Sequence, residues 1–388
     1  MEIFKILFRT LTAATFLLAV PFHGAHAAPC SGANLIRQAF PVGAATPETS
    51  WEICWQSLAK FGLVITHAAF TNHKAAGGAK TVKVFYDARV SEIFVPYHNN
   101  SHRFLDVSGF TFKLIPNLKS PTDCPKGTGA ILGPNKEVCK EVRDRGYIWK
   151  DHDRARRGKE IAVWGVLDAA NYNYIIAWEF RDDGVVVARL GASGQVLPDQ
   201  PFETHRHNVT WRFDLDLDGN TGDSVKLTRH FQNWNTPTEA PRPSTDSEVA
   251  ITTEKGLVWD PIAYNTLIIR DARLKNAGGK SSGYELVPLR SGTPRDNYFF
   301  QRKDFWVTRG EREGENLAIN LPTYANGESI PAGGADLVVW YTDSFHHTVR
   351  AEDGERRSNG SWYGETLVEW LGVMLKPENL FDRTPFYP

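Results

Sequence analysis

The sequence predicts an all-β protein, a single large antiparallel β-sandwich. Short apolar runs rich in Val, Ile and aromatic residues recur along the chain, and Gly, Pro, Asn and Asp separate them. Helical periodicity is scarce, and residues 54–62 are the one candidate for a short helical turn. No internal repeat or domain boundary is visible beyond the first residues. The expected strands are residues 82–86, 91–97, 161–166, 174–180 and 185–190, and the expected loops are residues 236–247 and 275–282.

The chain begins with the pattern of an export signal. Lys5 and Arg9 precede an apolar stretch over residues 11–22, and Ala25-His26-Ala27 is a small-x-small cleavage site. We therefore expect residues 1–27 to be removed and the mature protein to be soluble, secreted or periplasmic. The apolar stretch is too short to span a bilayer, so no membrane association is expected.

Four cysteines accompany this export signal: Cys30, Cys54, Cys124 and Cys139. An even number of cysteines in an exported chain favours two disulfides, and sequence alone allows three pairings. The sequentially local pairing is the simplest. A metal site built from all four thiolates is the alternative, but the chain has no C-x-x-C pair to begin it.

Charge and length narrow the possible partners. The formal net charge is −1, and the densest cationic run, residues 154–159, follows two aspartates and is expected to be a solvated loop. Nothing therefore indicates a nucleic-acid partner. The 12 Trp and 22 Phe residues allow a big packed core.

Residues 205–219 carry the strongest chemical signal. Side chains in a strand alternate between two faces, and here the alternation separates apolar from polar positions completely. The odd positions are apolar except for His205 and His207. Two imidazoles on one apolar face are placed as two ligands of one metal, because burial favours the neutral imidazole that binds metals. A hydrogen-bonded pair of structural histidines is the alternative.

The polar face of the same strand ends in Asp-Leu-Asp-Leu-Asp-Gly, residues 214–219. This run resembles the start of an EF-hand loop, but the twelfth position is Val225 instead of Glu. Three carboxylates on one face repel each other unless water solvates them or a cation bridges them. A solvated edge and a second cation site both remain open.

A second strand, residues 171–180, directs tyrosines toward the core. Tyr172 and Tyr174 share its apolar parity. By pattern alone, Tyr172 is an ordinary core tyrosine.

Several segments together resemble the copper-containing amine oxidases. Residues 171–174, Asn-Tyr-Asn-Tyr, are similar to the family motif whose first tyrosine becomes topaquinone. Residues 205–207 and 212–219 resemble its His-x-His and Arg-x-Asp-x-Asp-x-Asp-Gly segments. Residues 340–353 resemble the segment that holds the third copper ligand, and residues 373–388 resemble the C-terminal signature. The order of these segments along the chain makes chance an unlikely explanation.

This resemblance extends over residues 51–388 and implies roles for single residues. His205, His207 and His347 would bind copper, and Tyr172 would be the precursor of topaquinone.

Upstream, residues 90–97 resemble the strand that precedes the family's catalytic aspartate, and Asp106 aligns with that aspartate. Asp106 would then be the general base, Tyr97 would hydrogen-bond the quinone oxygen, and Asn171 would restrain the quinone ring. Cys124 and Cys139 match the family's intradomain disulfide.

A peripheral cation site is implied in the same way, with a calcium-like ion in a structural role. Its ligands would be the carboxylates of Asp214, Asp216 and Asp336 and the carbonyls of Leu215 and Leu337.

Together these matches imply one catalytic domain over residues 28–388, expected as a homodimer, that oxidises a small primary amine with O2. The products would be an aldehyde, ammonia and hydrogen peroxide. Two alternatives remain: a copper-binding member of the fold that lacks amine turnover and acts as a binding module, and a diverged oxidase for a specialised peptide or alkaloid-like amine.

Overall fold

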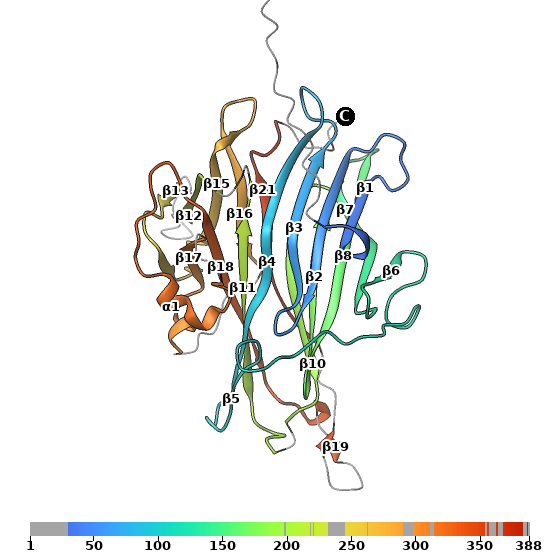
Figure 1. Ribbon diagram of the computed structural model, residues 1–388, viewed down its shortest axis with the longest axis vertical. Coiled ribbons are helices and arrows are strands. Elements are labelled where there is room, and N and C mark those ends of the chain that lie inside the picture. The colour runs from blue at the N-terminus through green and yellow to red at the C-terminus, as the bar shows by residue number, and fades with distance from the viewer. Residues whose placement is uncertain are drawn as a thin grey trace, which may run out of the picture.

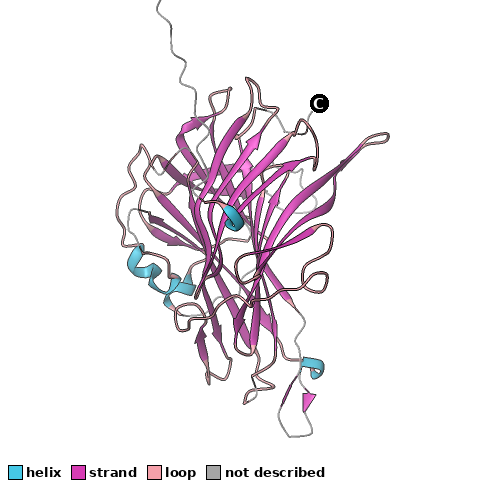
Figure 2. Ribbon diagram, turned by 45° about the vertical axis from the view of Figure 1, so that its right-hand side comes forward, coloured by secondary structure: helices cyan, strands magenta, loops and turns pink. Residues whose placement is uncertain are grey.

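A computed structural model describes residues 30–197, 199–217, 219, 221–231, 245–261, 263–289, 298–310, 314–353, 355–356, 362–363, 368–382 and 386. Within these ranges two antiparallel β-sheets face each other, as the ribbon shows (Figure 1). Strands dominate and helices are few and short (Figure 2). The predicted all-β sandwich is confirmed. No helix in the described ranges is long and apolar enough to cross a membrane.

In the first sheet, β11 lies between the long strand β4 and β18. Its order is β1 (Leu35–Phe40), β2 (Thr49–Leu58), β3 (Gly62–Asn72), β4 (Lys80–Pro96), β11 (His205–Leu215), β18 (Leu337–His347), β17 (Phe305–Arg309) and β14 (Lys255–Leu257), with β5 (Arg103–Leu105) paired to β4.

In the second sheet, β9 lies between β10 and β8. Its order is β13 (Thr245–Ala250), β12 (Asp223–Phe231), β15 (Thr266–Lys275), β16 (Ser281–Pro288), β21 (Glu369–Glu378), β10 (Val186–Gly194), β9 (Tyr172–Arg181), β8 (Ala155–Ala169), β7 (Val138–Lys150) and β6 (Gly129–Leu132). The remaining elements are the pair β19 (Glu355–Arg356) and β20 (Trp362–Tyr363), the helix α1 (Leu321–Tyr324), and the 3-10 turns η1 (Gly32–Asn34), η2 (Phe299–Arg302), η3 (Ala318–Asn320) and η4 (Ala351–Asp353).

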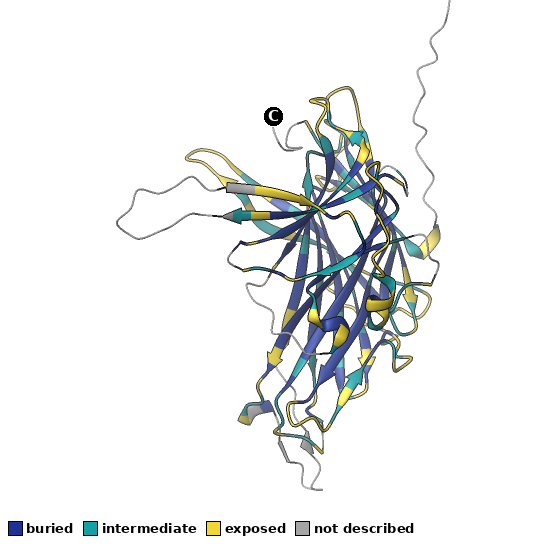
Figure 3. Cartoon of the chain, turned by 90° about the vertical axis from the view of Figure 1, so that its left-hand side faces the viewer, coloured by how far each residue is buried: buried dark blue, intermediate teal, exposed yellow. Residues whose placement is uncertain are grey.

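The core lies between the two sheets, where the inner faces of the strands meet. Figure 3 shows the strands buried along their middles and exposed toward the loops. Phe85 and Phe213 of the first sheet stack at 6.2 Å between ring centroids, and Trp178 of the second sheet contacts both rings edge-on. Aromatic side chains from both sheets thus interdigitate, as in other sandwiches.

The predicted helical turn over residues 54–62 is wrong. Trp51, Ile53 and Trp55 are all buried in the core, so this segment has a period of two and continues as β2. The chain then turns at Gly62, which has φ +67° and would place a Cβ 2.7 Å from the Ile176 side chain. Only glycine fits this turn, and it joins β2 to β3.

The other predicted segments fall as follows. Each of the five expected strands lies in β4, β8, β9 or β10, apart from Tyr97, which forms an isolated bridge after β4, and Val185, which precedes β10. The turn between β15 and β16 accounts for most of the expected loop over residues 275–282. The loop over residues 236–247 lies outside the described residues up to 244, and β13 begins at Thr245. The expected signal, residues 1–27, also lies outside them.

Both disulfides have the local pairing. Cys30 is bonded to Cys54 and Cys124 to Cys139, with Cα atoms 5.9 and 5.7 Å apart. The four-thiolate metal site is thereby excluded, because no cysteine remains free.

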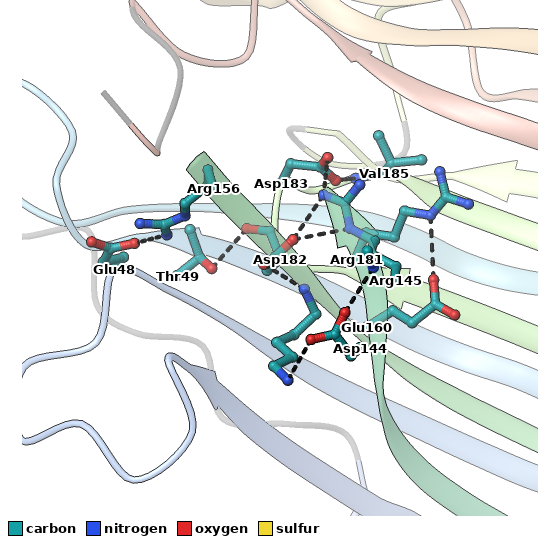
Figure 4. Close-up of polar contacts among 12 residues, drawn as sticks. Glu48, Thr49, Asp144, Arg145, Arg156, Glu160, Arg181, Asp182, Asp183 and Val185 are labelled. Atoms are coloured by element: carbon teal, nitrogen blue, oxygen red, sulfur yellow. Dashed lines mark hydrogen bonds and ion pairs between the residues drawn. The ribbon is translucent and has the colours of Figure 1, made fainter. Parts of the chain in front are cut away.

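A polar network joins the two sheets where β9 ends (Figure 4). The Arg145 guanidinium pairs with both Asp182 and Asp183, and the Lys159 N–H also donates to Asp182. The Thr49 hydroxyl, at the start of β2, donates to the Asp182 carbonyl at 2.8 Å. This network fixes one end of β9, and Tyr172 lies at the other end.

Candidate metal centre and catalytic site

Three histidines meet on the inner face of the first sheet. His205 and His207 lie two residues apart on β11, and the antiparallel register of β18 pairs His205 with His347. The three side chains each offer a ligand nitrogen, and these nitrogens lie within 4.8 Å of one another. In the described part of the chain, no other set of three His, Cys, Asp or Glu side chains converges in this way. The structure therefore brings together all three predicted copper ligands.

Burial keeps these imidazoles neutral. His205, His207 and His347 are 1%, 0% and 6% exposed. Desolvation lowers the pKa of His205 to about 4 and the pKa of His207 well below its usual value. The pKa of His347 is lowered for the same reason. At neutral pH each ring thus has one nitrogen lone pair available for a metal.

Hydrogen bonds on the outer nitrogens decide where those lone pairs point. His205 Nδ1 donates to the Glu203 carbonyl at 3.1 Å, and His347 Nε2 lies 3.3 Å from Asp353 Oδ2. The lone pairs of His205 Nε2 and His347 Nδ1 then face each other at 3.1 Å. Two facing lone pairs need a proton or a cation between them. Metal-binding histidines are oriented by such outer partners, which the sequence analysis did not identify.

His207 completes the set with an unpartnered nitrogen. Its Nε2 is buried and has no hydrogen-bond partner. Its Nδ1 lies 3.2 Å from the Tyr174 hydroxyl, and that hydroxyl donates its own proton to Asp106 Oδ2 at 2.7 Å. His207 Nδ1 therefore carries the proton, and Nε2 keeps a buried lone pair. Buried polar atoms are rarely left in this state, so a metal fits this set of donors.

Tyr172 reaches the histidines from the opposite sheet. It is the first residue of β9, and its hydroxyl lies 3.0 Å from His205 Nε2 and 2.7 Å from His347 Nδ1. Tyr172 is 5% exposed, as expected for a core tyrosine, but its oxygen lies against two of the proposed ligand nitrogens. Gly194 pairs with Tyr172, and a Cβ there would come within 2.7 Å of the Tyr172 Cα. Glycine thus allows β10 to approach this end of β9.

The two other residues proposed to contact the quinone lie next to Tyr172 in the chain (Asn171) and against His205 (Tyr97). Asn171 Nδ2 donates to the Gln195 carbonyl at 2.9 Å, which braces the backbone next to Tyr172. Tyr97 is 4% exposed, and its ring stacks on His205 with centroids 4.4 Å apart. Burial, together with the charge of Asp106, raises the pKa of the Tyr97 phenol well above its usual range.

Asp106 lies just after β5 and points into the core. Its N–H donates to the Ile93 carbonyl at 2.9 Å, and its carboxylate accepts the Tyr174 hydroxyl. Desolvation raises the pKa of Asp106 to about 7, although the Tyr174 hydrogen bond works in the opposite direction. This link through Tyr174 to His207 was not predicted from the sequence. The shared parity of Tyr172 and Tyr174 on β9 was the only available signal.

The polar face of β11 is buried, which removes the solvated edge, one of the two alternatives that the sequence left open. Arg212, Asp214 and Asp216 are 6%, 6% and 4% exposed. Arg212 donates to the Glu315 carbonyl and to Asp214, each at about 3 Å. The segment around Glu315 therefore covers this face. The alternation of apolar and polar residues along β11 does not reveal this cover.

The predicted peripheral cation ligands lie around this buried face. Desolvation raises the pKa of Asp214 to about 7, and the charge of the half-buried Asp336 adds to the effect. Asp216 pairs with Lys83. Leu215 and Leu337, whose carbonyls complete the predicted ligand set, are core residues. Calcium binding here stays a prediction.

Comparisons with known proteins agree on one family. A family model described as copper amine oxidase, enzyme domain, matches residues 49–387. Primary amine oxidase 1 of Arabidopsis thaliana is 24% identical over 87% of the chain, which covers 61% of that relative. N-methylputrescine oxidase 1 of Nicotiana tabacum is 24% identical over 66% of the chain, which covers 38% of that relative. The chain thus spans less than two thirds of the length of these relatives.

Solved structures show the same fold. An amine oxidase from Aspergillus nidulans superposes with a TM-score of 0.68 at 18% identity, with 94% of this chain and 56% of that chain covered. A lysyl oxidase from Pichia pastoris superposes with a TM-score of 0.67 at 16% identity, with 87% and 53% covered.

Proposed function

Because the chain belongs to the copper amine oxidase family, we propose that it is a copper-dependent primary-amine oxidase whose Tyr172 is converted to topaquinone. One observation carries this proposal. Three buried, neutral histidines of the first sheet converge, and the hydroxyl of a tyrosine from the second sheet lies within hydrogen-bond distance of the ligand nitrogens of two of them, His205 and His347. An ordinary core tyrosine has no reason to place its oxygen against two such nitrogens.

His205, His207 and His347 would hold the copper through the lone pairs assigned above. Imidazole ligands accommodate a redox-active copper ion, whereas zinc at the same site has no redox chemistry. Bound copper supplies the oxygen chemistry that oxidises the phenol, and the resulting quinone supplies the carbonyl that condenses with an amine. The role of Tyr172 itself is to present its ring at this position.

Asp106 is the proposed general base. A carboxylate with a pKa of about 7 is a better proton acceptor than an ordinary aspartate and is still largely ionised at slightly alkaline pH. Tyr174 occupies Oδ2, so Oδ1 takes the proton from the α-carbon of the bound amine. Tyr97 would hydrogen-bond the quinone oxygen, and Asn171 would restrain the quinone ring. Overall, a primary amine, O2 and water give an aldehyde, ammonia and hydrogen peroxide.

The test is the visible spectrum of the protein prepared with copper and air. A coloured protein that forms an adduct with phenylhydrazine is the expected result. His205→Ala, His207→Ala and His347→Ala should each lose tight copper binding and remain colourless. Tyr172→Phe is the matched control, which keeps copper but forms no adduct. Full copper in His347→Ala, or a colourless wild type with full copper, would contradict the proposal.

The substrate can be sought among amines that the relatives' names print. A panel of a diamine, N-methylputrescine, benzylamine and a lysyl peptide samples this range. Peroxide release on any of them supports an oxidase. Copper and quinone without turnover on the whole panel would favour the binding-module alternative.

We also propose one catalytic domain over residues 28–388, exported after removal of residues 1–27 and assembled as a homodimer. The signal pattern and the two disulfides support export. Mass analysis of the protein secreted by its own host tests the cleavage site, and light scattering tests the dimer.

A further inference from the structure

Glu92 is a fully buried carboxylate that the mechanism above does not use. It is 0% exposed and lies near the end of β4, close to Asp106. We infer that Glu92 is a positioning residue for Asp106, because its carboxylate holds the turn that carries the proposed base. This inference deepens the proposed function and rests on it.

A β-bulge gives Glu92 its direction. Opposite β11, Glu92 pairs with Thr210 and Val90 pairs with Trp211, so Ser91 is an extra residue in β4. Val90 lies in the core, and without the bulge Glu92 would share its face. After the bulge, the odd-numbered residues Ile93 and Val95 face the main core. Glu92 therefore lies on the opposite face of β4, together with Phe94.

The carboxylate of Glu92 then collects the backbone N–H groups of the turn. Oε1 accepts the Val107 N–H at 2.9 Å and the Ile93 N–H at 3.0 Å. Oε2 lies 3.3 Å from the Ser108 nitrogen. Both residues that follow Asp106 are therefore tied to one buried side chain. The Asp106 N–H is tied to the Ile93 carbonyl, so Asp106 is held on both sides.

The charge of Glu92 acts on Asp106 as well. Three N–H donors favour an ionised carboxylate, although burial opposes ionisation and raises the pKa of Glu92. A second negative group nearby adds to burial in raising the pKa of Asp106. The other titratable groups that face Asp106 are Tyr174 on β9 and Tyr97 after β4. Among these groups, Glu92 is the only other carboxylate.

The first experiment uses copper-free protein and does not depend on activity. Amide hydrogen exchange at Val107 and Ser108 is measured in wild type, Glu92→Gln and Glu92→Ala. Glu92→Ala should speed exchange at both amides about tenfold, because each loses its acceptor. Glu254→Ala is the matched control: Glu254 is 2% exposed and its carboxylate accepts two backbone N–H groups, from Arg309 and Asn326, away from Asp106. Its loss should leave Val107 and Ser108 unchanged.

The second experiment titrates the Asp106 carboxyl by carbon NMR in the same copper-free proteins. Glu92→Gln keeps the shape and an acceptor oxygen but removes the charge, so the pKa of Asp106 should fall by about one unit. Glu254→Gln should leave it in place. In loaded enzyme, Glu92→Gln should still form quinone, and the acid limb of kcat/KM should move to lower pH by the same amount.

An unmoved Asp106 titration in Glu92→Gln, or unchanged exchange at Val107 and Ser108 in Glu92→Ala, overturns the inference. If Glu92→Ala does not fold, the Glu92→Gln titration decides alone. A wild type that turns over no amine sinks the proposed function, whereas the copper-free titration still decides the role of Glu92.

Discussion

The surroundings of the His207 side chain indicate a bound metal, which the fold alone does not indicate. Its ring packs flat against Phe345, 4.8 Å between centroids, so it has no room to turn. A buried ring nitrogen without a partner costs about 1–3 kcal/mol, and a bound metal would offset that cost. The packing thus holds a neutral imidazole with its lone pair in the direction that a third ligand needs.

Replacing Asp106 should separate the two proposed phases of the chemistry. Asp106→Asn should still turn coloured and react with phenylhydrazine, because formation of the quinone needs only copper, oxygen and Tyr172. Turnover of a good amine should fall by about 10² or more, the usual size of a general-base effect. Stopped-flow reduction of the quinone by amine measures this step directly. Near-normal turnover would remove Asp106 from the mechanism.

The pKa of Asp106 also predicts a pH profile. A base works only when deprotonated, so kcat/KM should rise with pH and level off above the Asp106 pKa of about 7. Substrate amines also titrate, and amines of different basicity separate the two effects. The limb near pH 7 should stay in place across such amines and should be missing from Asp106→Asn. If the pH at which kcat/KM rises changes with the basicity of the amine, the titrating group is the substrate and not Asp106.

Asp353 should tune the metal without touching it. Its carboxylate lies beside His347 Nε2 and also accepts the Arg350 N–H at 2.8 Å. Asp353→Asn should weaken copper binding by about 10- to 100-fold, because the carboxylate that orients the imidazole is replaced by a neutral, weaker acceptor. Competition with a copper chelator gives this affinity. Asp182→Asn, another buried aspartate with an arginine partner, is the control and should bind copper like wild type.

At the scale of elements, strand alternation explains what the sequence could reveal. The period of two on β11 correctly placed His205 and His207 together, because alternation is a local property. The approach of His347 from β18 and of Tyr172 from the other sheet depends on pairing between distant segments. No local pattern encodes such pairing, and only the family resemblance supplied it.

Other features were out of reach for the same reason. The bulge at Ser91 leaves no mark in the pattern of a strand that is buried on both sides. The covered polar face of β11 depends on a segment about a hundred residues away, around Glu315. The link between Asp106 and Tyr174 likewise joins the two sheets.

The alternation of side chains along β18 gives a prediction about its two adjacent histidines, His346 and His347. His346 is exposed on the face opposite His347, and its Nε2 lies 2.8 Å from His98 Nε2. His346→Ala should therefore bind copper with wild-type stoichiometry, whereas His347→Ala should not. Elemental analysis of the two variants measures this. Copper lost equally from both would mean that β18 pairs in a different register.

For the molecule as a whole, the sandwich is joined at both ends of β9 by polar contacts. Tyr172 and the histidines form one junction, and the network around Asp182 and Thr49 forms the other. Between them the core is mainly apolar, although the Tyr174 hydroxyl donates to Asp106 and the Trp178 indole N–H donates to the Leu63 carbonyl. The metal centre thus lies at one end of β9, and bound copper would stabilise the folded state, in which its three ligands converge.

The predicted peripheral cation should stabilise the whole fold. If a calcium-like ion binds Asp214, Asp216 and Asp336, excess calcium should raise Tm, with a gain of about 2.7 kcal/mol at a hundred times Kd. A chelator should lower Tm, and Asp214→Asn or Asp336→Asn should abolish the response. Asp182→Asn is expected to be less stable and yet to keep it. A structure determined in calcium with only water between these carboxylates rules the site out.

The two disulfides have a consequence for the lifetime of such a catalyst. They occupy every cysteine of the chain, and only two methionines occur in the sequence, Met1 and the half-buried Met374. Thiols and thioethers are the side chains that peroxide damages most readily. With the proposed oxidase activity, the protein would release peroxide on each turnover and would offer that peroxide almost no sulfur to attack. Its low content of reactive sulfur would therefore slow its inactivation by its own product.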